Sequence, residues 1–125
     1  MKEKLYAARY ADGYLYLFEG NVKKSGRVFY SDVICDGRQA CKEFLPVVRY
    51  DNSPVELGID PNGNEYESIW VARSCYGELY LSLEKPVVTD GIISFHLPYM
   101  KWTGSDMFPK LKNNSCVKLS IIKTK

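Results

Sequence analysis

The feature that most constrains the fold is a pentapeptide pattern that occurs twice. Gly13–Leu17 and Gly77–Leu81 both read Gly-x-Leu-Tyr-Leu, at an offset of 77 − 13 = 64 residues. Further landmarks keep the same order in both halves: Leu5-Tyr6 with Ile69-Trp70, Ala8-Arg9 with Ala72-Arg73, Gly26 with Gly91, Leu45-Pro46 with Phe108-Pro109, and Val55-x-Leu57-x-Ile59 with Val117-x-Leu119-x-Ile121. A tandem duplication explains this shared order better than chance does. We expect repeat 1 at residues 4–60 and repeat 2 at residues 66–123.

The length of 125 residues is that of one ordinary domain, so residues 1–125 are expected to form a single domain. A repeat of about 60 residues buries too little apolar surface to be stable alone. We therefore expect the two repeats to share one core. Ten Tyr and a hydrophobic content of 46% are typical of a folded chain that is rich in strands.

Short alternating runs bounded by turn residues predict an all-β fold. Asp12-Gly13 between two such runs is a strong hairpin signal. Leu15 and Leu17 then share one face of their strand, which we expect to face the core. A third strand is expected at residues 27–31 and at the matching residues 92–95. Each half is expected to end in a fourth strand, at 55–59 and at 117–121, where apolar and polar residues alternate.

The residues before Pro46 and Pro109 predict a short helical turn in each half. We expect these turns at 42–45 and 105–108, with Ser105 as the cap of the second. Leu45 and Phe108 directly precede the prolines. Both are expected to plug one end of the core.

The connection between the halves, Asp60-Pro61-Asn62-Gly63-Asn64, consists of turn residues and is too short for a free linker. Strand 54–60 is therefore expected to pair antiparallel with strand 66–74. By symmetry, strand 116–123 would pair with strand 4–10. These pairings predict one barrel-like or sandwich domain, with a closed or nearly closed barrel as the favoured form.

Charge and targeting signals favour a soluble, cytoplasmic protein with no membrane partner. The net charge of +2 is too small to require a polyanionic partner. Five lysines and no acidic residue follow residue 109, a pattern that we interpret as protection of an edge strand. The N-terminal residues lack the apolar run of a signal peptide, and no segment is long enough to span a membrane.

The search for catalytic or metal-binding residues gives no candidate. His96 is the only histidine, and the four cysteines form no Cys-x-x-Cys pair, so we expect no metal site and reduced, mostly buried thiols. Asp32, Asp36 and Asp51 have no counterparts in the second half and are interpreted as turn and cap residues. No glycine-rich phosphate loop is present. We expect no catalytic residue and no cofactor, although an enzyme is unsupported rather than excluded.

Arg9 and Arg73 lie at equivalent positions of the two halves, and each has a charged side chain that is costly to bury. Alternation places Arg9 on the same face as Leu5 and Ala7, at the end of its strand. One interpretation is structural: the stem covers the edge of the core and the guanidinium group meets a carboxylate such as Glu19 or Glu84. The other is a ligand site near a pseudo-two-fold axis, where two guanidinium groups bind one phosphate or carboxylate.

Aromatic residues form a second recurring set beside the arginines. The members are two pairs of equivalent positions: Tyr6 with Trp70, and Tyr16 with Tyr80. They lie on the face opposite the leucines. Such a set is either a second packed face or a platform on which bases stack. With Arg9 and Arg73, these four residues are the predicted ligand-binding residues.

A series of short motifs runs through both halves: Leu15–Phe18, Leu45-Pro46, Val48-Arg49-Tyr50-Asp51 and Val55–Ile59, then Leu79–Leu81, Lys85-Pro86, Phe108-Pro109 and Val117–Ile121. In these motifs the chain resembles a group of small uncharacterised proteins from phages and mobile elements of gut anaerobic bacteria. Members of this group look like single copies of one half. The second half departs from the group at Lys110-Leu111-Lys112-Asn113, where the aromatic-acidic pair is missing.

Two classes of function fit these observations. The favoured class is a non-catalytic binding or inhibitory module, in the manner of a phage accessory protein, that captures a host protein or a small anionic, nucleotide-like ligand. The alternative is a domain that binds single-stranded nucleic acid through strands, aromatic residues and the basic tail. The nearly neutral charge disfavours a nucleic-acid partner. We expect a monomer or a dimer.

Overall fold

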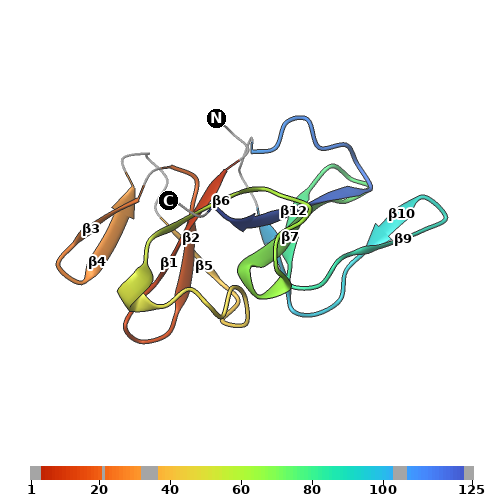
Figure 1. Cartoon of the computed structure of the whole chain (residues 1–125). Helices are drawn as coiled ribbons and strands as arrows, with labels where there is room; N and C mark the ends of the chain where they lie inside the picture. The colour runs from red at the N-terminus through yellow and green to blue at the C-terminus, as the bar shows by residue number, and fades with distance from the viewer. Residues whose placement is uncertain (1–3, 21, 32–36, 103–106, 123–125) are drawn as a thin grey trace.

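The computed structural model describes residues 4–20, 22–31, 37–102 and 107–122, and it is an all-β domain built on one eight-stranded antiparallel sheet (Figure 1). The strands of this sheet are β1 (Leu5–Arg9), β2 (Leu15–Phe18), β5 (Arg38–Ala40), β6 (Val55–Ile59), β7 (Ser68–Arg73), β8 (Leu79–Ser82), β11 (Tyr99–Trp102) and β12 (Ser115–Ile121). The predicted all-β fold is confirmed.

The strand order of the sheet is β11-β8-β7-β12-β6-β1-β2-β5. The first half thus has the order β5-β2-β1-β6, and the second half has the same order in equivalent strands, β11-β8-β7-β12. The two halves meet where β6 pairs with β12, with Leu119 opposite Ile59 and Ile121 opposite Leu57. This arrangement is consistent with a duplicated chain, and the duplication itself stays a prediction.

The predicted pairing across the connection between the halves is wrong. Strand β6 does not continue into a hairpin with β7, because β12 lies between them and pairs with both. The connection instead crosses the end of β12, where the Asp60 amide donates to the Lys118 carbonyl at 2.9 Å. The C-terminal strand therefore pairs with β6 and β7, and the expected pairing of 116–123 with 4–10 does not form.

Side chains bring the two outer strands of the curved sheet together. The Trp102 indole at the end of β11 donates to the Glu19 carboxylate at 2.9 Å, and Glu19 also pairs with Arg38 of β5 at 3.3 Å. The Arg38 guanidinium lies over the Trp102 ring, 4.3 Å from its centre. The sheet is therefore a nearly closed barrel, as predicted. Its last gap is bridged by an ion pair and a stacked arginine instead of a strand ladder.

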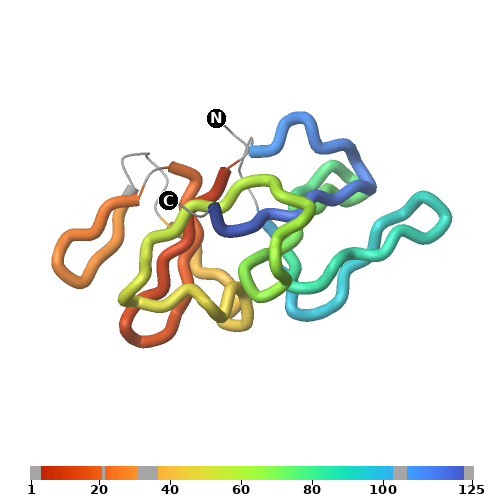
Figure 2. Tube along the Cα trace, in the orientation of Figure 1, coloured from red at the N-terminus to blue at the C-terminus, as the bar shows by residue number. Residues whose placement is uncertain are grey.

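Two separate hairpins project from the sheet, and they contain the strands predicted at 27–31 and 92–95. They are formed by β3 (Val22–Ser25) with β4 (Val28–Ser31), and by β9 (Val87–Thr89) with β10 (Ile92–Ser94). We call them arm 1 and arm 2. The residues expected as third strands of the sheet lie in these arms, and β5 and β11 take the place in the sheet. Figure 2 shows the arms at opposite ends of the molecule.

The core lies inside the curved sheet and is continuous between the two halves. Leu15, Leu17 and Leu81 are at most 1% exposed, which confirms the predicted core face. Leu45 and Phe108 are buried in the same cluster, as predicted for the plugs at the barrel end.

The predicted helical turn at 42–45 is wrong, and Ser105 lies outside the described residues. Residues 42–44 form a non-helical turn, and the backbone becomes left-handed at Leu45, with φ of 49°. Phe108 has the same conformation, with φ of 56°. Within the described residues, the short helical segments are instead the 3₁₀ turns η1 (Tyr50–Asn52) and η2 (Glu65–Glu67).

The shared core predicts the behaviour of an isolated half. A fragment of residues 1–62 would lose β12 as the neighbour of β6 and would expose its side of the common core. At this size the remaining burial is marginal. We expect the fragment to be unfolded by circular dichroism, or to dimerise in light scattering so that a second copy replaces the missing half. A folded monomeric fragment would contradict a shared core.

Candidate functional site

Arg9, at the end of β1, is bonded to the backbone of its own half. Its guanidinium group donates to five carbonyl oxygens, at distances from 2.6 to 3.4 Å; the acceptors belong to Gly13, Lys42, Phe44, Leu45 and Val48. These bonds use every N–H group of the side chain. Burial lowers the pKa of Arg9 from its ordinary value. A guanidinium group still remains protonated at neutral pH.

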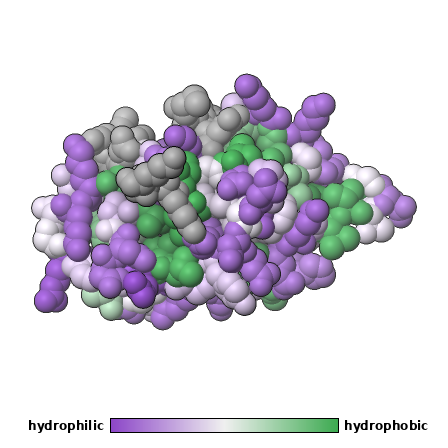
Figure 3. Space-filling model, viewed as in Figure 1, coloured by the Kyte–Doolittle hydropathy of each residue, from purple (hydrophilic) through white to green (hydrophobic). Residues whose placement is uncertain are grey.

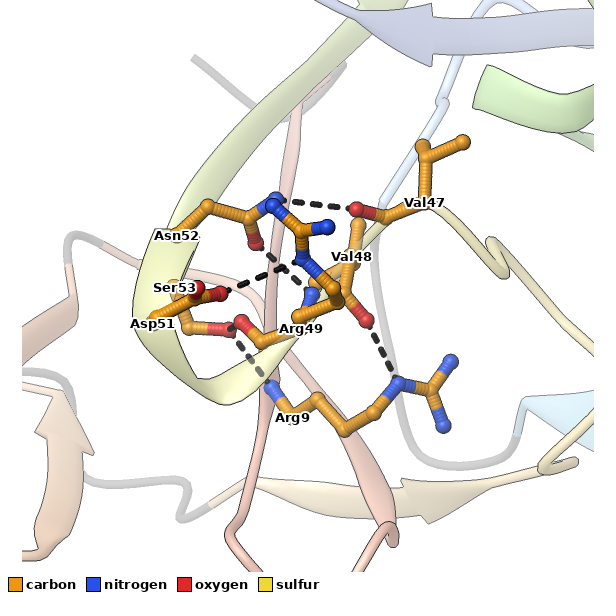
Figure 4. A network of polar contacts seen from close by, with 7 residues as sticks. All are labelled: Arg9, Val47, Val48, Arg49, Asp51, Asn52 and Ser53. Carbon is orange, nitrogen blue, oxygen red and sulfur yellow. Dashed lines mark hydrogen bonds and ion pairs between the residues drawn. The ribbon is translucent and has the colours of Figure 1, made fainter.

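Figure 4 shows how the chain around Arg9 is fixed. The Arg9 side chain reaches the carbonyl of Val48, while the Arg9 amide donates to Ser53 Oγ at 2.9 Å. Ser53 in turn donates to the Arg49 carbonyl at 2.6 Å, and the Asn52 side chain accepts from the Arg49 amide at 2.7 Å. The segment 48–53 is thereby held against β1 by polar contacts to the backbone.

Arg73 makes an equivalent set of contacts in the second half. Its guanidinium group donates to four carbonyl oxygens at 2.8 to 3.4 Å; the acceptors belong to Gly77, Met107, Phe108 and Leu111. Both arginines thus bond the hairpin glycine four residues ahead and the backbone beside the plug residue. The structural interpretation is supported in part. Both guanidinium groups are bonded within the fold, but their partners are carbonyl groups and not the expected carboxylates Glu19 or Glu84.

These contacts bear directly on the predicted anion site. Each guanidinium group is bonded within its own half, and among the described residues no contact joins Arg9 with Arg73. An anion at either group would have to compete with carbonyl groups that already accept from the guanidinium N–H groups. A ligand role for this pair stays a prediction, and the contacts favour a role in holding the loops at the barrel end.

Tyr16 and Tyr80, two of the predicted ligand-binding residues, do not pack on each other. Each packs where one of the arms joins the sheet. Tyr80 stacks on Phe95, which follows β10, with ring centres 4.7 Å apart. Tyr16 packs on Tyr10 at 4.9 Å, and Tyr10 packs on Phe29 of β4 at 5.2 Å. Both belong to a second packed aromatic layer outside the barrel.

Tyr6 and Trp70 also lie apart. The Tyr6 hydroxyl donates to Glu56 at 2.9 Å, and burial together with this carboxylate raises the pKa of Tyr6. Trp70 lines a surface pocket of about 640 Å³. The rest of the lining comes from both halves: Glu43, Pro46, Glu65, Tyr66, Leu83, Glu84, Lys85 and Lys118. We call this the Trp70 pocket.

Arm 2 is the other candidate surface, where the sequence predicted only a strand at residues 92–95. Three of its large apolar residues are strongly exposed: Val87 at 45%, Val88 at 51% and Ile92 at 57%. Leu97, just after the arm, is 76% exposed. In Figure 3 hydrophobic surface gathers on the projecting end that Figure 1 assigns to β9 and β10. The sequence feature that indicates a hairpin here is Asp90-Gly91 between two apolar runs.

Among the described residues, the nucleophilic and metal-binding residue types form no recognisable site. Cys41 and Cys116 are partly exposed and Cys75 is exposed, which corrects the prediction of mostly buried thiols; Cys35 lies outside the described residues. Burial raises the pKa of the Cys41 and Cys116 thiols, which makes them poorer nucleophiles. Within the part of the chain that the structure describes, no group of three His, Cys, Asp or Glu residues is arranged to hold a metal ion.

None of the helical segments among the described residues has the length and apolar character needed to cross a membrane. Comparison with known proteins gives no family model that matches the sequence, and no curated protein or solved structure matches significantly. The resemblance to phage and mobile-element proteins therefore stays a prediction. The function has to be inferred from the surfaces described above.

Proposed function

We propose that this protein is a non-catalytic binding module that captures a host protein through arm 2. The observation that carries the proposal is the exposure of Val87, Val88 and Ile92 on a projecting hairpin. Exposed apolar residues gathered in one place are typical of interaction surfaces, whereas single ones are common on any protein. The proposal includes a cytoplasmic location and a phage-encoded accessory role. Both are predictions made from the sequence.

The strand register of arm 2 puts the exposed Val87 and Ile92 on one face, and Val88 on the other face opposite the buried Ile93. Val87 lies opposite Ser94, and Thr89 lies opposite Ile92. Residues directly opposite each other point to the same side of a hairpin, so these four form one face, and all four are exposed. The face consists of uncharged side chains, three of them β-branched. Its chemistry suits an apolar partner surface.

Arm 1 provides the contrast within the same molecule. It carries Lys23, Lys24 and Arg27, whereas Asp90 is the only charged residue between positions 86 and 100. Charged residues, lysine above all, are a common protection of exposed strands against unwanted pairing. The lack of this protection on arm 2 is explained if a partner normally covers it.

Arm 2 is also held in a fixed conformation, which favours tight binding because little ordering is needed. Asp90 and Gly91 both have positive φ, at 52° and 79°, as a two-residue type I′ turn requires. The Ile93 side chain is buried, and its amide donates to Asn114 Oδ1 at 3.2 Å. Phe95 anchors the base of the arm on Tyr80.

A pair of single substitutions tests the proposal. Ile92 and Val28 are exposed to nearly the same extent, 57% and 55%, at similar places on the two arms. Ile92→Lys should reduce capture of the host partner by the tagged protein at least about tenfold, because a buried aliphatic side chain contributes about 1.5–3 kcal/mol. Val28→Lys should leave capture unchanged. The readout is the amount of one stoichiometric partner, measured by quantitative mass spectrometry after affinity purification.

Both variants should unfold at the wild-type urea concentration, since surface substitutions usually change stability by no more than about 0.5 kcal/mol. Equal capture by wild type and Ile92→Lys would contradict the proposal. Loss of capture in both variants would contradict it too, because it would locate binding elsewhere. Recovery of only this protein itself would show that arm 2 joins two copies of the chain.

A further inference from the structure

The Trp70 pocket shares no residue with arm 2 and has a different chemistry. Its floor is the Trp70 indole, which is partly exposed on the outer face of β7. A second ring, Tyr66 of η2, is 59% exposed beside it. Glu43 and Pro46 contribute from the first half of the chain. The pocket therefore offers two aromatic rings that a solute can reach.

Two cationic groups of the protein already lie against the Trp70 ring. Lys118 is the cross-strand neighbour of Trp70, and its Nζ lies 5.7 Å from the ring centre. Lys85 Nζ lies 5.5 Å from the same centre. Both distances are within the range of a cation–π interaction. Lys118 Nζ also donates to the Gly63 carbonyl, so it is tied to the backbone.

The carboxylates of the pocket outnumber its ammonium groups. Glu43, Glu65 and Glu84 come from three separate segments, and none of them forms an ion pair with another described residue. With Lys85 and Lys118, the lining carries three negative and two positive charges. An anion would meet the excess of carboxylates, whereas a cation would be attracted by both the carboxylates and the indole face.

We propose that the Trp70 pocket binds an organic cation, a guanidinium or alkylammonium group, against the indole. The incoming cation takes the place of the Lys85 ammonium group, which acts as an internal competitor. Lys118 stays in place because of its bond to Gly63. This inference is independent of the proposed function, since it concerns other residues and a small ligand instead of a protein surface.

Substitution of Lys85 should change the binding of cations and of anions in opposite directions. Lys85→Gln removes a positive charge and frees the ring, so it should tighten binding of a cation about threefold to tenfold. The same substitution would weaken binding of an anion. Glu84→Gln should weaken cation binding by a similar factor. Lys110→Gln, at an exposed lysine outside the pocket, should change neither.

The measurement is the chemical shift of the Trp70 indole N–H in two-dimensional NMR of the whole chain. The probes are tetramethylammonium and N-acetylarginine amide, with N-acetylleucine amide as the neutral control and adenosine monophosphate as the anionic one. Saturable shifts with the cations alone, strengthened by Lys85→Gln, would support the proposal. Two results would overturn it: no saturable shift with either cation, or a shift with adenosine monophosphate that Lys85→Gln weakens.

Discussion

Replacing Arg9 by methionine should lower the free energy of unfolding by about 3–5 kcal/mol. Methionine keeps most of the apolar stem but removes the guanidinium donor from the carbonyl groups of Gly13, Phe44 and Val48. The Leu45 carbonyl keeps only its bond from the Val48 amide. A hydrogen bond to a charged group contributes about 1.5–3 kcal/mol, and the several bonds made here are not additive. Urea denaturation followed by circular dichroism measures the change.

The expected loss of stability in Arg9→Met is large because the guanidinium group also supports a strained backbone. Leu45 has a positive φ, which costs roughly 1–2 kcal/mol for a residue with a side chain. The bonds from Arg9 to the Phe44 and Leu45 carbonyls offset this cost and keep the Leu45 side chain in the core. Arg73 and Phe108 have the same relation in the second half, so Arg73→Met should be comparably destabilising.

Two controls make this prediction specific. Arg49→Met removes an arginine whose side chain is 69% exposed and whose ion pair among the described residues is with the exposed Asp51, so it should cost no more than about 1 kcal/mol. Arg9→Lys should not restore stability, because one ammonium group does not reproduce a five-donor fork. Arg9→Met with wild-type stability would refute the structural role and would reopen the anion site.

Leu17→Ala and Leu81→Ala should each destabilise the fold by about 2–5 kcal/mol. Both side chains are fully buried in the cluster that joins the two halves, and truncation removes apolar contacts and leaves a cavity. Such a loss is a large share of the total stability of a domain of this size. Because the core is shared, each variant should still unfold in one transition that involves both halves.

The check is urea denaturation followed both by circular dichroism and by tryptophan fluorescence. Tyr76→Ala, at a residue that is 87% exposed, is the control and should change stability by no more than about 0.5 kcal/mol. Two separate transitions in Leu81→Ala would show that the halves fold independently. That result would contradict the single core.

Local patterns in the sequence predicted the parts of the fold that depend on neighbouring residues. Alternation identified the leucine face, and the Asp-Gly pair identified the first hairpin, because both are properties of a few consecutive positions. The positions of Leu45 and Phe108 before proline identified the plugs. The face of Arg9 was also correct, since the side chain points toward the barrel end beside the core.

The pairing of strands and the contacts of the arginines were not predictable in this way. Strand β12 lies between β6 and β7 although the connection from β6 to β7 is short, and no local pattern specifies such an insertion. The partners of Arg9 are carbonyl groups as far as 39 residues away, which carry no sequence signal of their own. The predicted helical turn at 42–45 failed for a related reason, because the Phe44 carbonyl there bonds the Arg9 guanidinium group.

The most direct test of a binding role for arm 2 is photo-crosslinking in the native host. A photoreactive amino acid is placed at position 92 of arm 2 in one variant and at position 28 of arm 1 in another. We expect position 92 to form a crosslink to one host protein, identified by mass spectrometry, and position 28 to form none. A crosslink of equal yield from position 28, or none from position 92 in a folded protein, would contradict it.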